Sequence, residues 1–264
     1  MTAVSRPSRI TLYVYGLLIL FVLYLPLVAV GFASVSKARY LNFPVKRYTS
    51  EWLVSSLTSP NVHVLVTTSL KVALVVTVIS VVIGFFAALA FARFQWRYRS
   101  FYQKLILLPI FFPQTVLGLA LLIWFSALGI TPSWKTAVVA HLVWITPITT
   151  LIIAIRAYGF DPSLEEAARD MGATTFEIMR EVTIPLLMPG IVAAGLFAFL
   201  LSWGNFPLSL FTSGVDATLP KWLYSRMVSG FTPQIPAIGM LAVASSTVLV
   251  LLGLAVMWGL RRRA

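Results

Sequence analysis

The residue types that perform acid–base, nucleophilic or metal chemistry are few in this sequence and unevenly placed. The chain has eight acidic residues, and six of them fall within one short stretch: Asp161, Glu165, Glu166, Asp170, Glu177 and Glu181. It has no cysteine, and its two histidines, His63 and His141, lie far apart without acidic neighbours. An enzyme needs a nucleophile with a base, or a set of metal ligands. The sequence therefore predicts no catalytic residue and no metal site.

The acidic stretch begins with the signals of a short helix. Pro162 suits a first helical position, and Ser163 and Glu166 have the spacing of a capping box. Four residues then recur at helical spacing on one face: Leu164, Ala167, Ala168 and Met171. A solvated loop with ordinary caps is the alternative interpretation. An apolar stripe outside a membrane span, however, favours contact with a protein partner.

A glycine divides this stretch into two parts. Gly172 interrupts the helical pattern, and a glycine readily ends a helix in a left-handed conformation. Thr174 or Thr175 can then start a second short helix before the next apolar run. The pattern predicts a helix–turn–helix hairpin within residues 159–185.

Composition indicates that this hairpin belongs to a membrane protein. The chain is 59% hydrophobic and 11% charged, whereas a soluble domain carries about 25% charged residues. The net charge of +12 does not indicate a nucleic-acid partner, because the basic residues stand in short groups between apolar runs. Lys and Arg that flank membrane spans have this distribution. We therefore expect a multi-pass protein of the cell (inner) membrane, in contact with lipid and without nucleic acid.

Six apolar runs are long enough to cross the roughly 30 Å hydrocarbon core as helices: residues 10–32, 62–92, 105–128, 136–155, 184–211 and 238–260. The first is longer than the apolar part of a signal peptide, so we expect an uncleaved span. Prolines inside the spans either bend them or are tolerated by packing. Both interpretations stay open for Pro109, Pro113 and Pro207, whereas tolerance is favoured for the others. The predicted fold class is an all-α membrane protein with six transmembrane helices in one domain over residues 1–264.

The distribution of Lys and Arg predicts the orientation of these spans. The N-terminus and residues 93–104, 156–183 and 261–264 together carry 12 of the 20 basic residues. Cytoplasmic segments are enriched in basic residues, so we expect these four segments and both termini on the cytoplasmic side. Residues 33–61 then lie outside, where the pattern around Trp52 indicates a short interfacial helix.

Motif spacing now points to a family. Glu166-Ala167-Ala168, three residues, Gly172, nine residues and then Val182-Thr-Ile-Pro185 resemble the EAA signature of ABC importer permeases. The family's ending is usually Ile-x-Leu-Pro, so Val-x-Ile-Pro is a conservative departure. Residues 68–80, 107–118 and 159–168 also resemble this family. In detail the chain is most similar to the second permease of spermidine/putrescine-type importers.

The resemblance implies a type I ABC importer permease, in which the hairpin is a coupling helix seated on a cytoplasmic ATPase subunit. The residues it assigns to ATPase coupling are Glu165, Glu166, Ala167, Ala168, Met171, Gly172 and Pro185. Two ATPase subunits would bind ATP and Mg²⁺, because this chain has no Walker-type phosphate loop and needs no cofactor of its own. The other implied partners are a second homologous permease, in a heterodimer or a homodimer, and an extracytoplasmic substrate-binding protein.

The same resemblance places a substrate pathway along the third, fourth and fifth spans. The candidate pathway residues are Gln114, Trp124, Trp144, Ser202, Trp203, Asn205 and Ser209. The alternative role for each of them is interhelical hydrogen bonding or a place in an interfacial aromatic belt. Similar polyamine permeases carry acidic residues near Gly204 and Asn205, whereas no carboxylate lies inside any predicted span here.

A polyamine such as spermidine or putrescine is the first substrate hypothesis. A monoamine, an amino-acid derivative, an opine or an aminophosphonate is the alternative for the same machinery. An ion-coupled secondary transporter is the rival of another class. It usually needs ionisable groups within the membrane, so the absence of carboxylates from the predicted spans argues against it.

Overall fold

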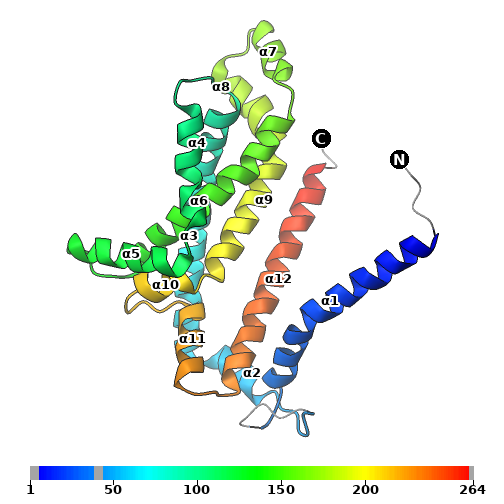
Figure 1. Ribbon diagram of the computed structural model, residues 1–264, viewed down its shortest axis with the longest axis vertical. Helices are drawn as coiled ribbons and strands as arrows, with labels where there is room; N and C mark the ends of the chain where they lie inside the picture. Colours follow the sequence, from blue (N-terminus) through cyan, green and yellow to red (C-terminus); the bar gives the residue numbers. More distant parts are fainter. Residues whose placement is uncertain (1–5, 39–43, 262–264) are drawn as a thin grey trace. The chain divides into compact units, whose positions relative to one another are not determined.

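The computed structural model describes residues 6–38 and 44–261, and this part of the chain is built from helices (Figure 1). It divides into two units, one formed by residues up to Val62 with Ser225–Ser245, and the other by His63–Tyr224 with the residues from Ser246 onward. Within the described residues, five helices are long and apolar enough to cross a membrane, and a bent pair of helices supplies a sixth crossing if it counts as one span. The predicted all-α membrane fold is therefore confirmed.

The first unit contains α1 (Arg6–Ser34), α2 (Glu51–Thr58) and the first part of α12 (Gln234–Arg261). Large apolar side chains of α1 are exposed along most of its length, as expected of a helix that faces lipid or another membrane subunit. The short helix predicted around Trp52 is α2. The indole Nε1 of Trp52 donates a 3.1 Å hydrogen bond to the carbonyl oxygen of Ser36, which ties α2 to the end of α1.

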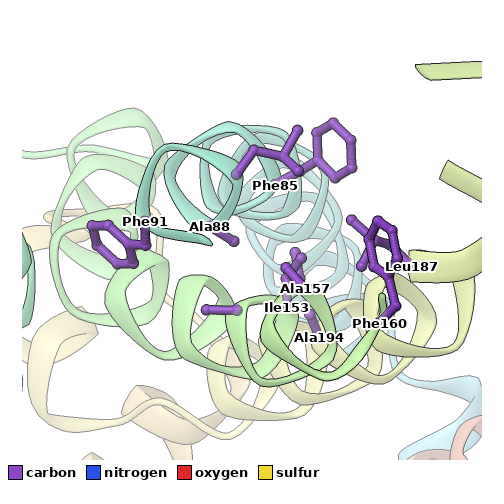
Figure 2. Packing of buried hydrophobic residues seen from close by; sticks show 10 residues of the cluster. Phe85, Ala88, Phe91, Ile153, Ala157, Phe160, Leu187 and Ala194 are labelled. Atoms are coloured by element: carbon purple, nitrogen blue, oxygen red, sulfur yellow. The ribbon is translucent and has the colours of Figure 1, made fainter. Parts of the chain in front are cut away.

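The core of the second unit lies between α3 (Pro60–Ala92), α6 (Trp134–Gly159) and α9 (Ile184–Trp203). Figure 2 shows the buried side chains that meet there, among them Phe85, Ala88, Ile153, Ala157, Leu187 and Ala194. Lipid is as apolar as these side chains, so close backbone approach stabilises the packing. Gly84 permits it between α3 and α6, because a Cβ atom there would lie 2.9 Å from Thr149 Oγ1.

The predicted third span, residues 105–128, is not a single straight helix. It consists of α4 (Arg99–Leu107), the 3₁₀ turn η1 (Leu108–Phe111) and α5 (Gln114–Ala127). The two helical arms meet at an angle of 102°. Phe112 is extended because it precedes Pro113, and a residue before proline avoids helical conformations. Pro113 therefore bends the chain, and α5 packs against α10 (Pro207–Thr212).

The predicted fifth span, residues 184–211, is also interrupted. The helical segments α8 (Thr175–Ile178), η2 (Met179–Thr183) and α9 run together to Trp203, and α10 begins only at Pro207. Proline has no N–H to continue the ladder, so it starts a helix more easily than it extends one. Other prolines of the predicted spans do not interrupt them. Pro26, Pro147 and Pro189 lie inside continuous helices.

After α10 the chain forms α11 (Leu219–Ser229), whose first residues, up to Tyr224, belong to the second unit. The backbone N–H of Leu219 donates a 2.7 Å hydrogen bond to the Ser69 hydroxyl of α3. The loop before it is anchored to α6, because the Asp216 carboxylate accepts a 3.0 Å hydrogen bond from the Trp134 N–H. These bonds hold the segment that follows the interrupted span against α3 and α6.

Candidate functional site

The predicted hairpin is present and consists of α7 (Ser163–Asp170), a turn and α8. Figure 1 shows α7 and α8 at one end of α6 and α9. The start of α7 differs from the prediction, because Ser163 and Glu166 do not form a capping box. Instead the Asp161 carboxylate accepts a 3.0 Å hydrogen bond from the Ser163 N–H. This bond holds the pKa of Asp161 below its ordinary value.

The turn of the hairpin has the predicted left-handed glycine. Gly172 has a φ of 87°, a conformation that side chains with a Cβ atom rarely adopt. Its N–H donates to the carbonyl of Arg169 at 2.9 Å, and the N–H of Ala173 donates to the carbonyl of Ala168 at 3.1 Å. These two bonds are those of a Schellman motif. The glycine thus satisfies the last carbonyl groups of α7 while it reverses the chain.

The second helix of the hairpin begins with a reciprocal cap. The Thr174 hydroxyl accepts a 3.3 Å bond from the Glu177 N–H, while the Glu177 carboxylate accepts a 2.7 Å bond from the Thr174 N–H. These bonds confirm the start predicted at the threonine pair. Hydrogen bonds to the Glu177 carboxylate lower its pKa below the ordinary value. The backbone N–H of Thr174 has the larger effect, and the Thr174 hydroxyl has the smaller one. The cap fixes the direction in which α8 leaves the turn.

The apolar stripe predicted on α7 is divided between two faces. Ala168 is buried, since α7 packs against α8 and η2, whereas Ala167 is exposed. Leu164 is also exposed, and Met171 exposes 83% of its surface. Phe176 on α8 adds a ring that is 73% exposed. The hairpin therefore presents an apolar tip, here defined as Leu164, Ala167, Met171 and Phe176, and Ala168 is not part of it.

Glu165, one of the residues assigned to ATPase coupling, makes its contacts inside the chain. Its Oε2 lies 3.5 Å from Arg93 Nε, and its Oε1 accepts a 2.7 Å hydrogen bond from the Thr183 hydroxyl. Because the carboxylate is used inside the chain, it is not offered to the surroundings. Glu166 and Pro185 are exposed, so Glu166 is the glutamate of the signature that faces away from the chain.

The break in the fifth span forms a second site, and Asn205 lies at its centre. The Asn205 side-chain oxygen accepts a 3.1 Å bond from the Leu208 N–H and so caps α10. Its side-chain nitrogen donates a 3.1 Å bond to Gln114 Oε1 at the start of α5. Asn205 is 4% exposed. The break is therefore an ordered, internally bonded segment.

His141 of α6 joins the two sides of this break. Its Nδ1 lies 2.9 Å from the Ser202 hydroxyl, before the break, and its Nε2 lies 3.0 Å from the Ser209 hydroxyl, after it. All three side chains are buried. The sequence identified His141 as a polar residue of the fourth span but gave no sign that it bridges two serines. Only the packing of α6 against α9 and α10 brings them together.

The sequence also matches a known protein family. Residues 80–263 match the family described as binding-protein-dependent transport system inner membrane component. The chain belongs to this family. It is 27% identical over 231 residues to the spermidine/putrescine transport system permease protein PotC of Haemophilus influenzae, which covers 87% of this chain and 90% of that protein. It is 29% identical over 250 residues to the putrescine transport system permease protein PotI of Escherichia coli, which covers 92% and 88%.

Solved structures share the fold of this permease. A bacterial ABC transporter that imports the acidic polysaccharide alginate superposes with a TM-score of 0.74 at 14% identity, over 96% of both chains. The MetNI methionine ABC transporter superposes with a TM-score of 0.62 at 18% identity, over 77% of this chain and 99% of that chain. The chain therefore shares its helical fold with the membrane subunits of solved ABC transporters.

The structure brings together some of the predicted pathway residues and separates others. Gln114 and Asn205 are hydrogen-bonded to each other, and Ser202 and Ser209 are joined by His141. The three tryptophans have other neighbours in the permease. Trp203 stacks on Phe199, Trp124 is exposed and lies beside Phe125, and Trp144 packs against an apolar cluster of α3, α6 and α9.

Proposed function

We propose that this chain is the membrane-spanning subunit of an ATP-driven importer, and that the apolar tip of its hairpin docks on a cytoplasmic ATPase subunit. The observation that supports docking is the exposure of Met171 and Phe176, at 83% and 73%, on a hairpin whose two helix starts are held by side-chain hydrogen bonds. Apolar side chains exposed in water at the end of an ordered element favour a protein partner. Ala167 permits close approach, and Glu166 provides a charge beside it.

The proposed assembly contains two permeases, two ATPase subunits and an external substrate-binding protein. In this assembly the chain acts as one permease domain with both termini on the cytoplasmic side. The ATPase subunits bind ATP and Mg²⁺, and their closure moves the hairpin. The permease itself performs no chemistry. Membership of the binding-protein-dependent family supports this set of partners.

The proposed cargo is a small organic cation of the polyamine type. The similarity to PotC and PotI over most of the chain supports this class. A different observation favours the second candidate, a monoamine, an amino-acid derivative, an opine or an aminophosphonate. All eight acidic residues lie outside the predicted spans, and Asn205 at the break is already hydrogen-bonded. A polycation would receive little charge compensation from this chain alone.

Uptake into liposomes tests both parts of this proposal. The complex is purified with its own ATPases and binding protein, reconstituted, and given labelled spermidine with ATP or with a proton or sodium gradient. ATP-dependent uptake that stops with an ATPase-deficient partner is the expected result. Uptake driven by the ion gradient without ATP would contradict the importer assignment. Competition by excess putrescine or by an aminophosphonate then distinguishes the two substrate classes.

A further inference from the structure

Arg93 makes a partly buried ion pair that connects the hairpin to the end of α3. It directly follows Ala92, the last residue of α3, and its Nε lies 3.5 Å from Glu165 Oε2 in α7. The guanidinium also lies 3.8 Å from the ring centroid of Phe160, one of the buried residues in Figure 2. The side chains of Arg93 and Glu165 are only 15% and 19% exposed. Two charges are thus largely removed from solvent at the base of the hairpin.

Glu165 extends this contact to a third element. Its second oxygen accepts the 2.7 Å hydrogen bond from Thr183, the last residue of the π-helical turn η2 that leads into α9. A π-helical turn inside a longer helix is frequently found at a functional position. Arg93, Glu165 and Thr183, called here the hairpin joint, therefore link α3, α7 and α9 through one carboxylate.

The hydrogen-bonding groups of Arg93 in the hairpin joint are incompletely paired. Arg93 Nε and Nη2 are buried and have no hydrogen-bond partner among the described residues. A buried pair with incomplete hydrogen bonding contributes little to stability and is often less favourable than an apolar replacement. Stability alone does not explain why the chain holds two charges here.

A cavity beside the joint offers alternative partners to both charges. It has a volume of about 280 Å³, and its lining includes Arg93, Glu165, Glu166 and Arg169. Two arginines and two glutamates around one cavity allow more than one pairing. Arg93 and Glu165 therefore share this cavity with a second glutamate, Glu166, and a second arginine, Arg169. A set of charges that can pair in two ways converts a displacement into a change of state, and the additional glutamate and arginine are the groups that a second pairing would use.

We infer that the hairpin joint transmits movement of the hairpin to the ends of α3 and α9. This inference rests on the proposed function, because the movement comes from the ATPase on which the hairpin docks. Arg93 and Glu165 are positioning residues, which contact neither cargo nor nucleotide. When the pair is lost, the ATPases still bind the hairpin and hydrolyse ATP, but the spans no longer follow.

The test measures ATP hydrolysed per cargo molecule imported, in the reconstituted complex, for Arg93→Met, Glu165→Gln and the double variant. Each single change is expected to raise this ratio on the order of tenfold, the usual size of a coupling between sites. The double variant should be no worse than the poorer single variant, because both remove the same contact. Arg97→Met is the matched control, since Arg97 is an exposed arginine of the same connection that lies 5.7 Å from the Tyr98 ring.

Glu165→Gln keeps an oxygen for the Thr183 hydroxyl, so it carries the test alone if Arg93→Met does not assemble. Wild-type coupling in Glu165→Gln, or losses that add in the double variant, would overturn the inference. A wild-type complex that imports nothing with ATP would instead contradict the proposed function. The two failures are therefore distinguishable.

Discussion

The side-chain nitrogen of Asn205 donates a 3.1 Å hydrogen bond to the side-chain oxygen of Gln114, which joins the break in the fifth span to the first turn of α5. Both residues lie close to a proline that interrupts a span: Pro113 directly precedes Gln114, and Pro207 follows Asn205 two positions later. The two interrupted spans are thus held to each other at their irregular points. Asn205 uses its amide for structure, so a role in cargo binding requires this bond to open.

The two hydrogen bonds of Asn205 predict different losses of stability for two substitutions at this position. Asn205→Asp keeps the oxygen that caps α10 and loses the donor to Gln114, whereas Asn205→Leu loses both hydrogen bonds. Each lost bond costs about 1 kcal/mol. Asn205→Leu should therefore lower the thermal unfolding midpoint of the purified complex further than Asn205→Asp. Adding Gln114→Lys to Asn205→Asp supplies a donor and should recover part of the loss. Equal midpoints for the two single variants would show that the amide is not used as described.

The hairpin turn provides a second prediction. Gly172 has a φ of 87°, and a β-branched residue in this conformation costs ~1–2 kcal/mol. Gly172→Val should therefore disturb the Schellman turn and reduce cargo uptake, while insertion into the membrane stays normal. Gly239→Ala is the matched control, because this glycine has an ordinary helical conformation and open space around its α-carbon. Wild-type uptake by Gly172→Val would contradict the importance of the turn.

Exposure of the two signature alanines gives a third prediction. Ala167 is exposed, whereas Ala168 is only 7% exposed. The chain has no cysteine, so a single introduced cysteine is labelled without background. Ala167→Cys should react with a membrane-impermeant maleimide in inside-out vesicles and crosslink to an ATPase subunit, and Ala168→Cys should do neither. Reaction of Ala167→Cys from outside intact cells would contradict the proposed orientation.

Local chemistry made much of the hairpin predictable. The left-handed Gly172 and the start at Thr174 depend on residues within a few positions of each other, and both predictions are confirmed. The division of α7 into a buried Ala168 and an exposed Ala167 was not predictable. An eight-residue helix with alanine on adjacent positions does not show which of them will meet α8 and η2.

Contacts between distant residues account for what the sequence did not show. Arg93 and Glu165 belong to different connections, and only the packing of α3 beside α6 and α9 brings them together. The sequence also did not show which prolines interrupt a span and which are tolerated inside it. Pro113 and Pro207 interrupt their spans, whereas Pro147 lies within a continuous helix. A proline in a membrane span permits both outcomes, so its presence in the sequence does not decide between them.

The buried bridge formed by His141 gives the last prediction. Its two ring nitrogens lie 2.9 Å and 3.0 Å from the hydroxyl groups of Ser202 and Ser209, and all three residues are buried. His141→Leu removes both partners at once and leaves two buried hydroxyl groups unpaired. Each unpaired group costs about 1–3 kcal/mol. We expect a clear fall in the thermal unfolding midpoint and a loss of uptake, because the two sides of the break are no longer held together.

Removing the serines as well distinguishes the hydrogen bonds from the shape of the histidine. In the triple variant His141→Leu, Ser202→Ala, Ser209→Ala, no buried hydroxyl of this bridge remains unpaired, so part of the lost stability should return. Uptake should stay low, since the break still lacks its connection to α6. Thermal unfolding and ATP-driven uptake are measured on the same preparations. If the triple variant is less stable than His141→Leu, the cost comes from the cavity around the ring, and the hydrogen-bonded bridge is not what holds the break.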